Sequence, residues 1–83
     1  RTAGCIFKNP LVDGQRLPAG RLIDQAGLKG ARAGGAEISR KHANFIEAGQ
    51  GAKAQDVIDL MELARQTVRR SAGIELEPEI EVW

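Results

Sequence analysis

The chain has 83 residues, of which 42% are hydrophobic, and a formal net charge of +1. A chain of this length forms one domain, residues 1–83, and its near-zero net charge gives no argument for binding nucleic acid or a membrane surface. No stretch approaches the roughly 20 apolar residues of a membrane-spanning helix. A single cysteine excludes an internal disulfide framework and fits a reducing compartment.

The two ends read as cuts within a longer protein. The chain begins with Arg1 rather than Met, has no signal peptide, and stops at Trp83 without a polar tail. Aromatic residues are scarce, so the core must be built from Ile, Leu, Val and Ala. We therefore expect a domain that normally packs against a neighbour.

A short strand and a loop open the chain. Residues 5–7 read as a strand that Pro10 ends, because proline cannot continue a hydrogen-bonded ladder. Residues 11–17 read as a loop with a turn at Asp13-Gly14.

A short helix is expected over residues 18–26. Pro18 suits the first helical position and Gly27 suits the position just past a C-terminus. Small residues and glycines then fill residues 29–35, where the backbone can turn tightly or approach another segment closely.

A hairpin and a long helix follow. Residues 36–39 and 44–48 read as two strands that residues 40–43 connect. Residues 54–72 carry one apolar stripe at helical spacing and have Gly73 as a stop signal. The stripe consists of Val57, Leu60, Met61, Ala64 and Val68.

The last segment, residues 74–82, alternates apolar residues with glutamates, and Pro78 interrupts it. This pattern predicts two short strand pieces or one edge strand with a bulge. The whole order, β-α-β-β-α-β, predicts an α+β domain with a small, largely antiparallel sheet and two helices.

Cys5 is the sharpest candidate for chemistry. A thiol with a pKa of about 8.5 holds its proton at neutral pH and can still give it up, which suits a general acid that protonates a carbanion. The alternative is a buried structural cysteine, since free cysteine is among the most buried residue types. Gly4 and Asn9 favour the first reading because they allow close approach and add polarity.

Glu79 is the second candidate. It directly follows Pro78, whose ring fixes the local backbone, and a positioned acid needs a fixed backbone. The other glutamates of the alternating run, Glu75, Glu77 and Glu81, are expected to form a solvated strand face.

Basic side chains in predicted loops and at strand ends are candidate phosphate contacts, with solvated surface as the alternative. One Cys and one His do not make a zinc site. The sequence GARAGG at 30–35 does not match the dinucleotide fingerprint and no P-loop is present, so we expect no metal or nucleotide cofactor bound by this chain alone. The basic candidates are Lys8, Lys29, Arg32, Arg40, Lys41 and His42.

Six segments, in order, resemble the C-terminal domain of the UDP-N-acetylenolpyruvoylglucosamine reductase (MurB) family, also called UDP-N-acetylmuramate dehydrogenase. They cover nearly the whole chain, and the first and last are the most specific. The segments are AGCIFKNP at 3–10, AGRLIDQAGLKG at 19–30, GGAEIS at 34–39, KHANFI at 41–46, DVIDLM at 56–61 and LEPE at 76–79.

The resemblance implies a cytoplasmic flavoenzyme of bacterial peptidoglycan synthesis. The family uses NADPH to reduce FAD, which then delivers hydride to the enolpyruvyl group of a UDP-sugar. Its flavin-binding domains precede the matched region. The resemblance therefore implies that this chain is the substrate-binding domain, that FAD and NADPH bind mainly in upstream domains, and that the chain alone is inactive.

The resemblance also implies roles for individual residues. Cys5 takes the position of the general acid, where many members carry serine. Glu79 matches a glutamate beside the substrate carboxylate, which helps to stabilise an enol-like intermediate. Both must reach one reacting group, so we expect them on one face of the sheet. The positions that look like contacts to the UDP part are Asn9, Lys29 and His42, with Lys8 nearby.

Two other readings stay open at this point. The chain could be a stand-alone module that binds an anionic ligand or a protein partner through the same loops without catalysis. It could also be a purely structural fragment. The coding sequence upstream of Arg1 separates these readings, because a preceding flavin domain would favour the reductase.

Overall fold

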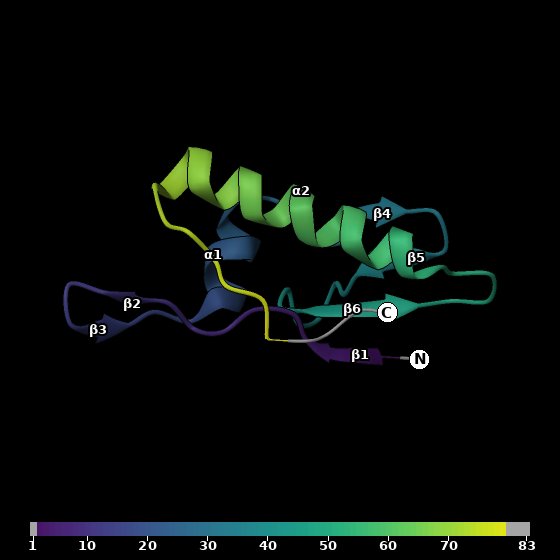
Figure 1. Ribbon diagram of the computed structural model, residues 1–83, viewed down its shortest axis with the longest axis horizontal. Coiled ribbons are helices and arrows are strands. Elements are labelled where there is room, and N and C mark those ends of the chain that lie inside the picture. Colours follow the sequence, from purple (N-terminus) through teal and green to yellow (C-terminus); the bar gives the residue numbers. More distant parts are fainter. Residues whose placement is uncertain (1, 80–83) are drawn as a thin grey trace.

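A four-stranded antiparallel sheet forms the base of the fold (Figure 1). The computed structural model describes the backbone of residues 2–79 and the side chains of residues 6–79. The predicted class, α+β with a small antiparallel sheet and two helices, is confirmed. The strands lie in the order β1 (Thr2–Cys5), β6 (Phe45–Ala48), β5 (Ala36–Ile38) and β4 (Arg32–Ala33).

The expected hairpin forms between β5 and β6. The two strands pair in register, with Ile38 opposite Ile46. Ser39, which is buried, organises the connection, because its hydroxyl oxygen accepts the N–H groups of Lys41 at 3.2 Å and His42 at 3.3 Å. The hydroxyl thus satisfies two backbone donors that leave the sheet ladder at the turn.

Helix α1 (Ala19–Gln25) is one residue shorter at each end than predicted. Pro18 is the N-cap, in an extended conformation, rather than the first helical residue. The side-chain oxygen of Asn9 accepts the N–H of Ala19 at 2.9 Å, so a distant amide satisfies a donor that the helix leaves unpaired.

Helix α2 (Ala54–Ala72) has the predicted bounds and ends at Gly73, which adopts φ = 69°. Figure 1 shows it lying across one face of the sheet, where it contacts β4, β5 and α1. Four of the five predicted stripe residues are buried and Met61 is half-buried. One continuous core lies between α2 and the sheet. Its largest fully buried members are Phe7, Ile6, Ile23, Ile38, Ile46, Leu60, Leu76 and Val68.

The predicted loop at residues 11–17 contains a second hairpin, β2 (Leu11–Val12) with β3 (Gln15–Arg16). Its two central residues, Asp13 and Gly14, have φ of 52° and 80°, which is the pattern of a tight two-residue hairpin turn. The Asp-Gly signal marks this turn correctly. The flanking strands are too short and too exposed to show an apolar alternation.

The first strand is displaced from its predicted place at residues 5–7. Strand β1 ends at Cys5, and Phe7 instead forms an isolated bridge with Pro78. This bridge is the only strand pairing that the described part of the C-terminal segment, residues 74–79, makes. The rest of the predicted alternation, residues 80–82, lies outside the described residues.

Pro78, expected to divide this segment into two strand pieces or to form a bulge in an edge strand, itself takes part in the pairing. The two flanking hydrogen bonds run from Lys8 N–H to Glu77 O at 2.9 Å and from Glu79 N–H to Ile6 O at 2.8 Å. Pro78 therefore occupies a position in the antiparallel pair where no N–H is required. Proline and strand pairing are compatible at this register.

The N-terminus of α2 is fixed to the turn between β4 and β5. The carboxylate of Asp56 accepts the N–H of Lys53 at 2.9 Å and that of Gly35 at 3.2 Å. These two hydrogen bonds stabilise the charged form and hold the pKa of the Asp56 carboxyl below its ordinary value. The contact brings the backbone of Gly35 directly under the residues that lead into the helix.

Gly35→Ala is expected to lower the free energy of unfolding by about 1–3 kcal/mol. A Cβ at this position would lie 2.7 Å from the backbone N of Ala52 and 2.8 Å from its Cα, so backbone must move. Gly20→Ala is the matched control. Its Cβ would meet Asn44 at an ordinary 3.5 Å inside α1, so a gain of about 0.5–1 kcal/mol is expected. Denaturant titration should show that the free energy of unfolding falls in Gly35→Ala and rises in Gly20→Ala. A change of the same sign in both variants would contradict the packing argument.

Candidate functional site

A groove rich in basic side chains lies beside α1, and we call it the basic groove. Its volume is about 320 Å³. Gly20 and Arg21 of α1 form one side, and residues 41–45, which lead into β6, form the other. Among the described lining residues Asp24 is the only carboxylate. The basic members are Arg21, Lys29, Lys41 and His42.

Two predicted substrate contacts, Lys29 and His42, meet in this groove. The Nζ atom of Lys29 lies 3.5 Å from a carboxylate oxygen of Asp24, and both side chains keep substantial contact with solvent. Such an exposed ion pair contributes little energy, so Lys29 can turn to a stronger anionic ligand at small cost. The ring of His42 lies 5.4 Å from that of Phe45, tilted by 45°.

Two groove residues were absent from the predicted set of substrate contacts. Lys41 was only one of several basic loop candidates, and Arg21 was not considered because it falls inside a predicted helix. The sequence shows only a basic residue on a short predicted helix, which gives no sign of the loop that Arg21 faces.

The other two predicted contacts lie outside the described lining of the groove. Asn9 caps α1 through Ala19, and its carbonyl oxygen accepts a hydrogen bond from the guanidinium of Arg16 at 2.9 Å. Asn9 thus positions the first turn of α1, whose Gly20 and Arg21 line the groove. Lys8 is exposed, and its backbone N–H pairs with Glu77.

The remaining loop cations have a different partner. Arg32 and Arg40 each lie 3.3 Å from a carboxylate oxygen of Glu37 on β5. Both are therefore engaged with one acid of the sheet and do not line the basic groove. A phosphate role for these two arginines stays a prediction.

The backbone brings the two predicted proton-handling residues to neighbouring segments. Cys5 ends β1 opposite Phe45, and the next residue, Ile6, accepts the backbone N–H of Glu79. The side chain of Glu79 is exposed. The side chain of Cys5 lies outside the described ones, so a shared face for the two side chains stays a prediction.

The side-chain amide of Asn44 binds the backbone of Phe7, close to where the segments that carry Cys5 and Glu79 pair. Its Oδ1 accepts the N–H of Phe7 at 2.9 Å, and its Nδ2 donates to the carbonyl oxygen of Phe7 at 2.9 Å. The backbone oxygen of Asn44 also accepts the N–H of Ile6 at 2.8 Å. Asn44 was not singled out from the sequence, because its partners lie far away along the chain.

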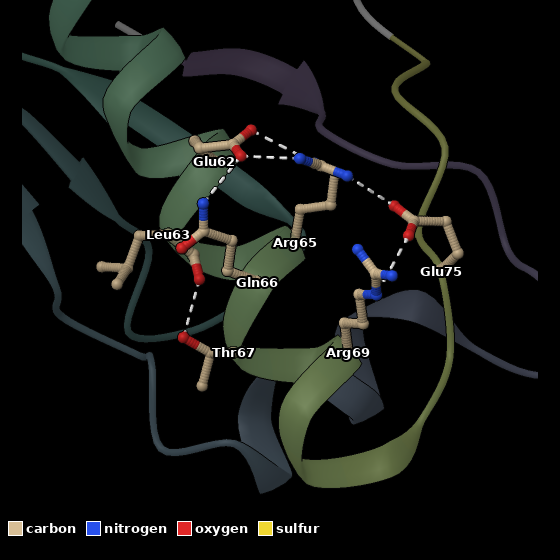
Figure 2. A network of polar contacts seen from close by, with 7 residues as sticks. All are labelled: Glu62, Leu63, Arg65, Gln66, Thr67, Arg69 and Glu75. Atoms are coloured by element: carbon tan, nitrogen blue, oxygen red, sulfur yellow. Dashed lines mark hydrogen bonds and ion pairs between the residues drawn. The ribbon is translucent and has the colours of Figure 1, made fainter.

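A cluster of charged residues fastens the C-terminal segment to α2, as Figure 2 shows. Arg65 lies 2.6 Å from Glu62 and 2.8 Å from Glu75, and Arg69 lies 3.8 Å from Glu75. Hydrogen bonds from Arg65 and then Gln66 hold the pKa of the Glu62 carboxyl below its ordinary value. Glu75, expected on a solvated strand face, is instead a partner of the helix.

Neither the basic groove nor the hollow along β4, β5 and β6 has the mainly apolar lining expected around FAD. The basic groove and a second hollow of about 330 Å³ along β4, β5 and β6 are both open and partly polar. Among the described lining residues, the rings of His42 and Phe45 are the only aromatic ones along either. A flavin dinucleotide is larger than a drug-sized ligand, for which pockets span about 300–1,000 Å³ and are mainly apolar.

No group of three or more His, Cys, Asp or Glu side chains could hold a metal ion within the described part of the chain. None of the helices among the described residues is both long and apolar enough to cross a membrane.

Comparison with known proteins identifies one family. The family model described as UDP-N-acetylenolpyruvoylglucosamine reductase, C-terminal domain, matches residues 1–83. The UDP-N-acetylenolpyruvoylglucosamine reductase 2 of Symbiobacterium thermophilum is 53% identical over 81 residues, which make up 98% of this chain and 25% of that protein. The corresponding reductase of Moorella thermoacetica is 52% identical over 81 residues, covering 98% of the chain and 26% of that protein.

A solved structure agrees with these relatives. The crystal structure of UDP-N-acetylenolpyruvylglucosamine reductase (MurB) from Thermus caldophilus aligns with a TM-score of 0.75 and 49% identity. The alignment covers 99% of this chain and 27% of that one. The chain thus spans between 25% and 27% of the length of these three proteins.

Proposed function

This chain belongs to the family of UDP-N-acetylenolpyruvoylglucosamine reductase C-terminal domains, and from this we propose that residues 1–83 are the substrate-binding and proton-donating domain of a cytoplasmic reductase. The complete enzyme uses FAD and NADPH, held mainly by its other domains, to convert UDP-N-acetylglucosamine enolpyruvate to UDP-N-acetylmuramate in peptidoglycan synthesis. The chain alone is inactive.

The observation that carries this proposal is the meeting of Lys29 and His42 in the basic groove. A diphosphate needs several positive groups within a few ångströms, and Arg21 and Lys41 add to the two predicted ones. Asn9 supports the site from the first turn of α1. Lys8, on the segment that pairs with residue 77, follows the proposed proton donor by three positions in the chain.

The proton chemistry is assigned to Cys5 and Glu79. Reduction of the enolpyruvyl double bond adds a hydride to one carbon and a proton to the other, and the flavin, once NADPH has reduced it, would supply the hydride. The Cys5 thiol gives its proton to the second carbon: the S–H bond breaks, a C–H bond forms, and the thiolate later regains a proton from water. Glu79 lies beside the substrate carboxylate and helps to stabilise the enol-like intermediate. The backbone pairing of Ile6 with Glu79 supports this assignment.

The groove is tested by Lys29→Ala in the complete reductase. Loss of one charge-assisted contact to phosphate is expected to raise KM for the UDP-sugar about tenfold, with little change in kcat. Steady-state NADPH oxidation measures both constants. Lys53→Ala, an exposed lysine that does not line the groove, is the matched control and should leave KM unchanged.

Two outcomes would contradict the proposal. A KM that stays the same in both variants would remove the groove from the substrate site. A complete protein that does not oxidise NADPH in the presence of the UDP-sugar would favour instead a module that binds an anion without catalysis.

A further inference from the structure

We propose that Asn44 is a positioning residue that fixes the relative placement of the segments carrying Cys5 and Glu79. The inference rests on the proposed function for the roles of those two residues. Its structural basis is separate, because it depends only on the contacts that Asn44 makes with Ile6 and Phe7.

Asn44 continues the sheet at the point where strand pairing stops. Strands β1 and β6 are in register at Cys5 and Phe45, and beyond this pair the chain no longer forms a regular ladder. The amide of Asn44 replaces the ladder by pairing with both the N–H and the C=O of Phe7. A side chain therefore takes the place of a strand neighbour.

This pairing reaches Glu79 through one intermediate residue. The carbonyl oxygen of Asn44 accepts the N–H of Ile6, and the carbonyl oxygen of Ile6 accepts the N–H of Glu79. Ile6 is fully buried and Phe7 is 1% exposed, so their backbone cannot shift without disturbing the core. The Ile6–Phe7 segment thus transmits the position of Asn44 to both proposed proton-handling residues.

Asn44 also lines the basic groove beside Lys41 and His42. The same residue therefore adjoins the proposed diphosphate site and holds the backbone that directly follows the proposed proton donor. Because both polar ends of its amide already pair with Phe7, Asn44 acts through the backbone rather than by contacting substrate.

The reciprocal pairing requires a donor and an acceptor on one side chain. Alanine supplies neither group. An ionised aspartate accepts the Phe7 N–H but places a negative charge against the Phe7 carbonyl oxygen. A protonated aspartic acid again offers one donor and one acceptor. Asn44→Asp should therefore recover function as the pH falls, whereas Asn44→Ala should not.

The experiment measures the two half-reactions of the complete reductase in wild type, Asn44→Ala and Asn44→Asp. Asn44→Ala is expected to lower kcat for substrate reduction about 100-fold, as misplacement of a reacting group by about 1 Å does, and to leave flavin reduction by NADPH unchanged. The ratio of Asn44→Asp to wild-type kcat is expected to rise as the pH is lowered. A ratio that does not change with pH would overturn the inference.

Val68→Ala separates positioning from general destabilisation. Val68 is fully buried on α2, and it takes no part in the pairing of Asn44 with Ile6 and Phe7. If Asn44→Ala and Val68→Ala lower the melting temperature alike and also lower kcat alike, Asn44 is merely structural and the inference fails. If Asn44→Ala does not fold, the pH dependence of kcat in Asn44→Asp tests the inference by itself.

A measurement that does not depend on enzyme activity tests the inference separately from the proposed function. Amide hydrogen exchange of Glu79 in the complete protein is expected to speed up at least tenfold in Asn44→Ala, although Asn44 does not touch Glu79, and to stay unchanged in Val68→Ala. Unchanged exchange in Asn44→Ala overturns the inference. A wild-type protein that fails to reduce the UDP-sugar overturns the proposed function alone, and exchange then still tests the positioning.

Discussion

Cys5→Ala in the complete reductase is expected to slow substrate reduction about 10²–10⁴-fold, the usual contribution of a positioned general acid, and to spare flavin reduction by NADPH. In the proposed reaction, the second half-reaction creates a carbanion beside a carboxylate, and this carbanion must be protonated. The first half-reaction needs no proton from this domain. Stopped-flow absorbance of the flavin follows the two half-reactions separately.

Cys5→Ser is the matched control for this prediction. The resemblance described above implies a serine at this position in many relatives, so this variant is expected to keep appreciable activity. A thiol is more acidic than a hydroxyl, so the two proteins should differ in how the rate depends on pH. If Cys5→Ala slows both half-reactions equally, or neither, Cys5 is better explained as a packing residue.

Leu76→Ala is expected to lower the free energy of unfolding by about 2–5 kcal/mol. Leu76 is 1% exposed and belongs to the core, and it is the buried anchor of the segment that leads to Glu79. Truncation leaves a cavity where that segment meets the rest of the fold. Denaturant titration measures the loss of free energy of unfolding. The dependence of that free energy on denaturant concentration should be the same in wild type and Leu76→Ala if both unfold in one step.

Leu63→Ala provides the same substitution at a surface position. Leu63 lies on α2 and is 41% exposed, so the expected change is about 0.5 kcal/mol or less. Equal losses at both positions would contradict the placement of Leu76 in the core.

Much of the fold could be predicted because its signals are local. The bounds of α2 follow from a clear apolar period and a terminal glycine, and both lie within the helix or next to it. The hairpin of β5 and β6 follows from two apolar runs close together in sequence. The shift of β1 and the bridge at Pro78 could not be predicted, because they depend on which distant backbone groups meet.

The same distinction applies to the candidate site. Lys29 and His42 were singled out from the other basic loop residues only through the family resemblance. The structure places both along one groove, and their contact with substrate stays a prediction. Arg21 escaped selection because a helical residue gives no sign of which loop it faces. Asn44 escaped because an isolated asparagine looks the same whether it is solvated or paired with a remote backbone.

The pairing of Ile6 with Glu79 has a consequence for synthesis on the ribosome. Residues near the two ends of the described chain share a hydrogen bond, so this part of the fold cannot close until residue 79 has left the exit tunnel. Contacts between distant parts of a chain are also the slow ones to form, because loop closure must precede them. The nascent domain should therefore complete its helices and central hairpin first and assemble the Cys5–Glu79 region last, after its translation ends.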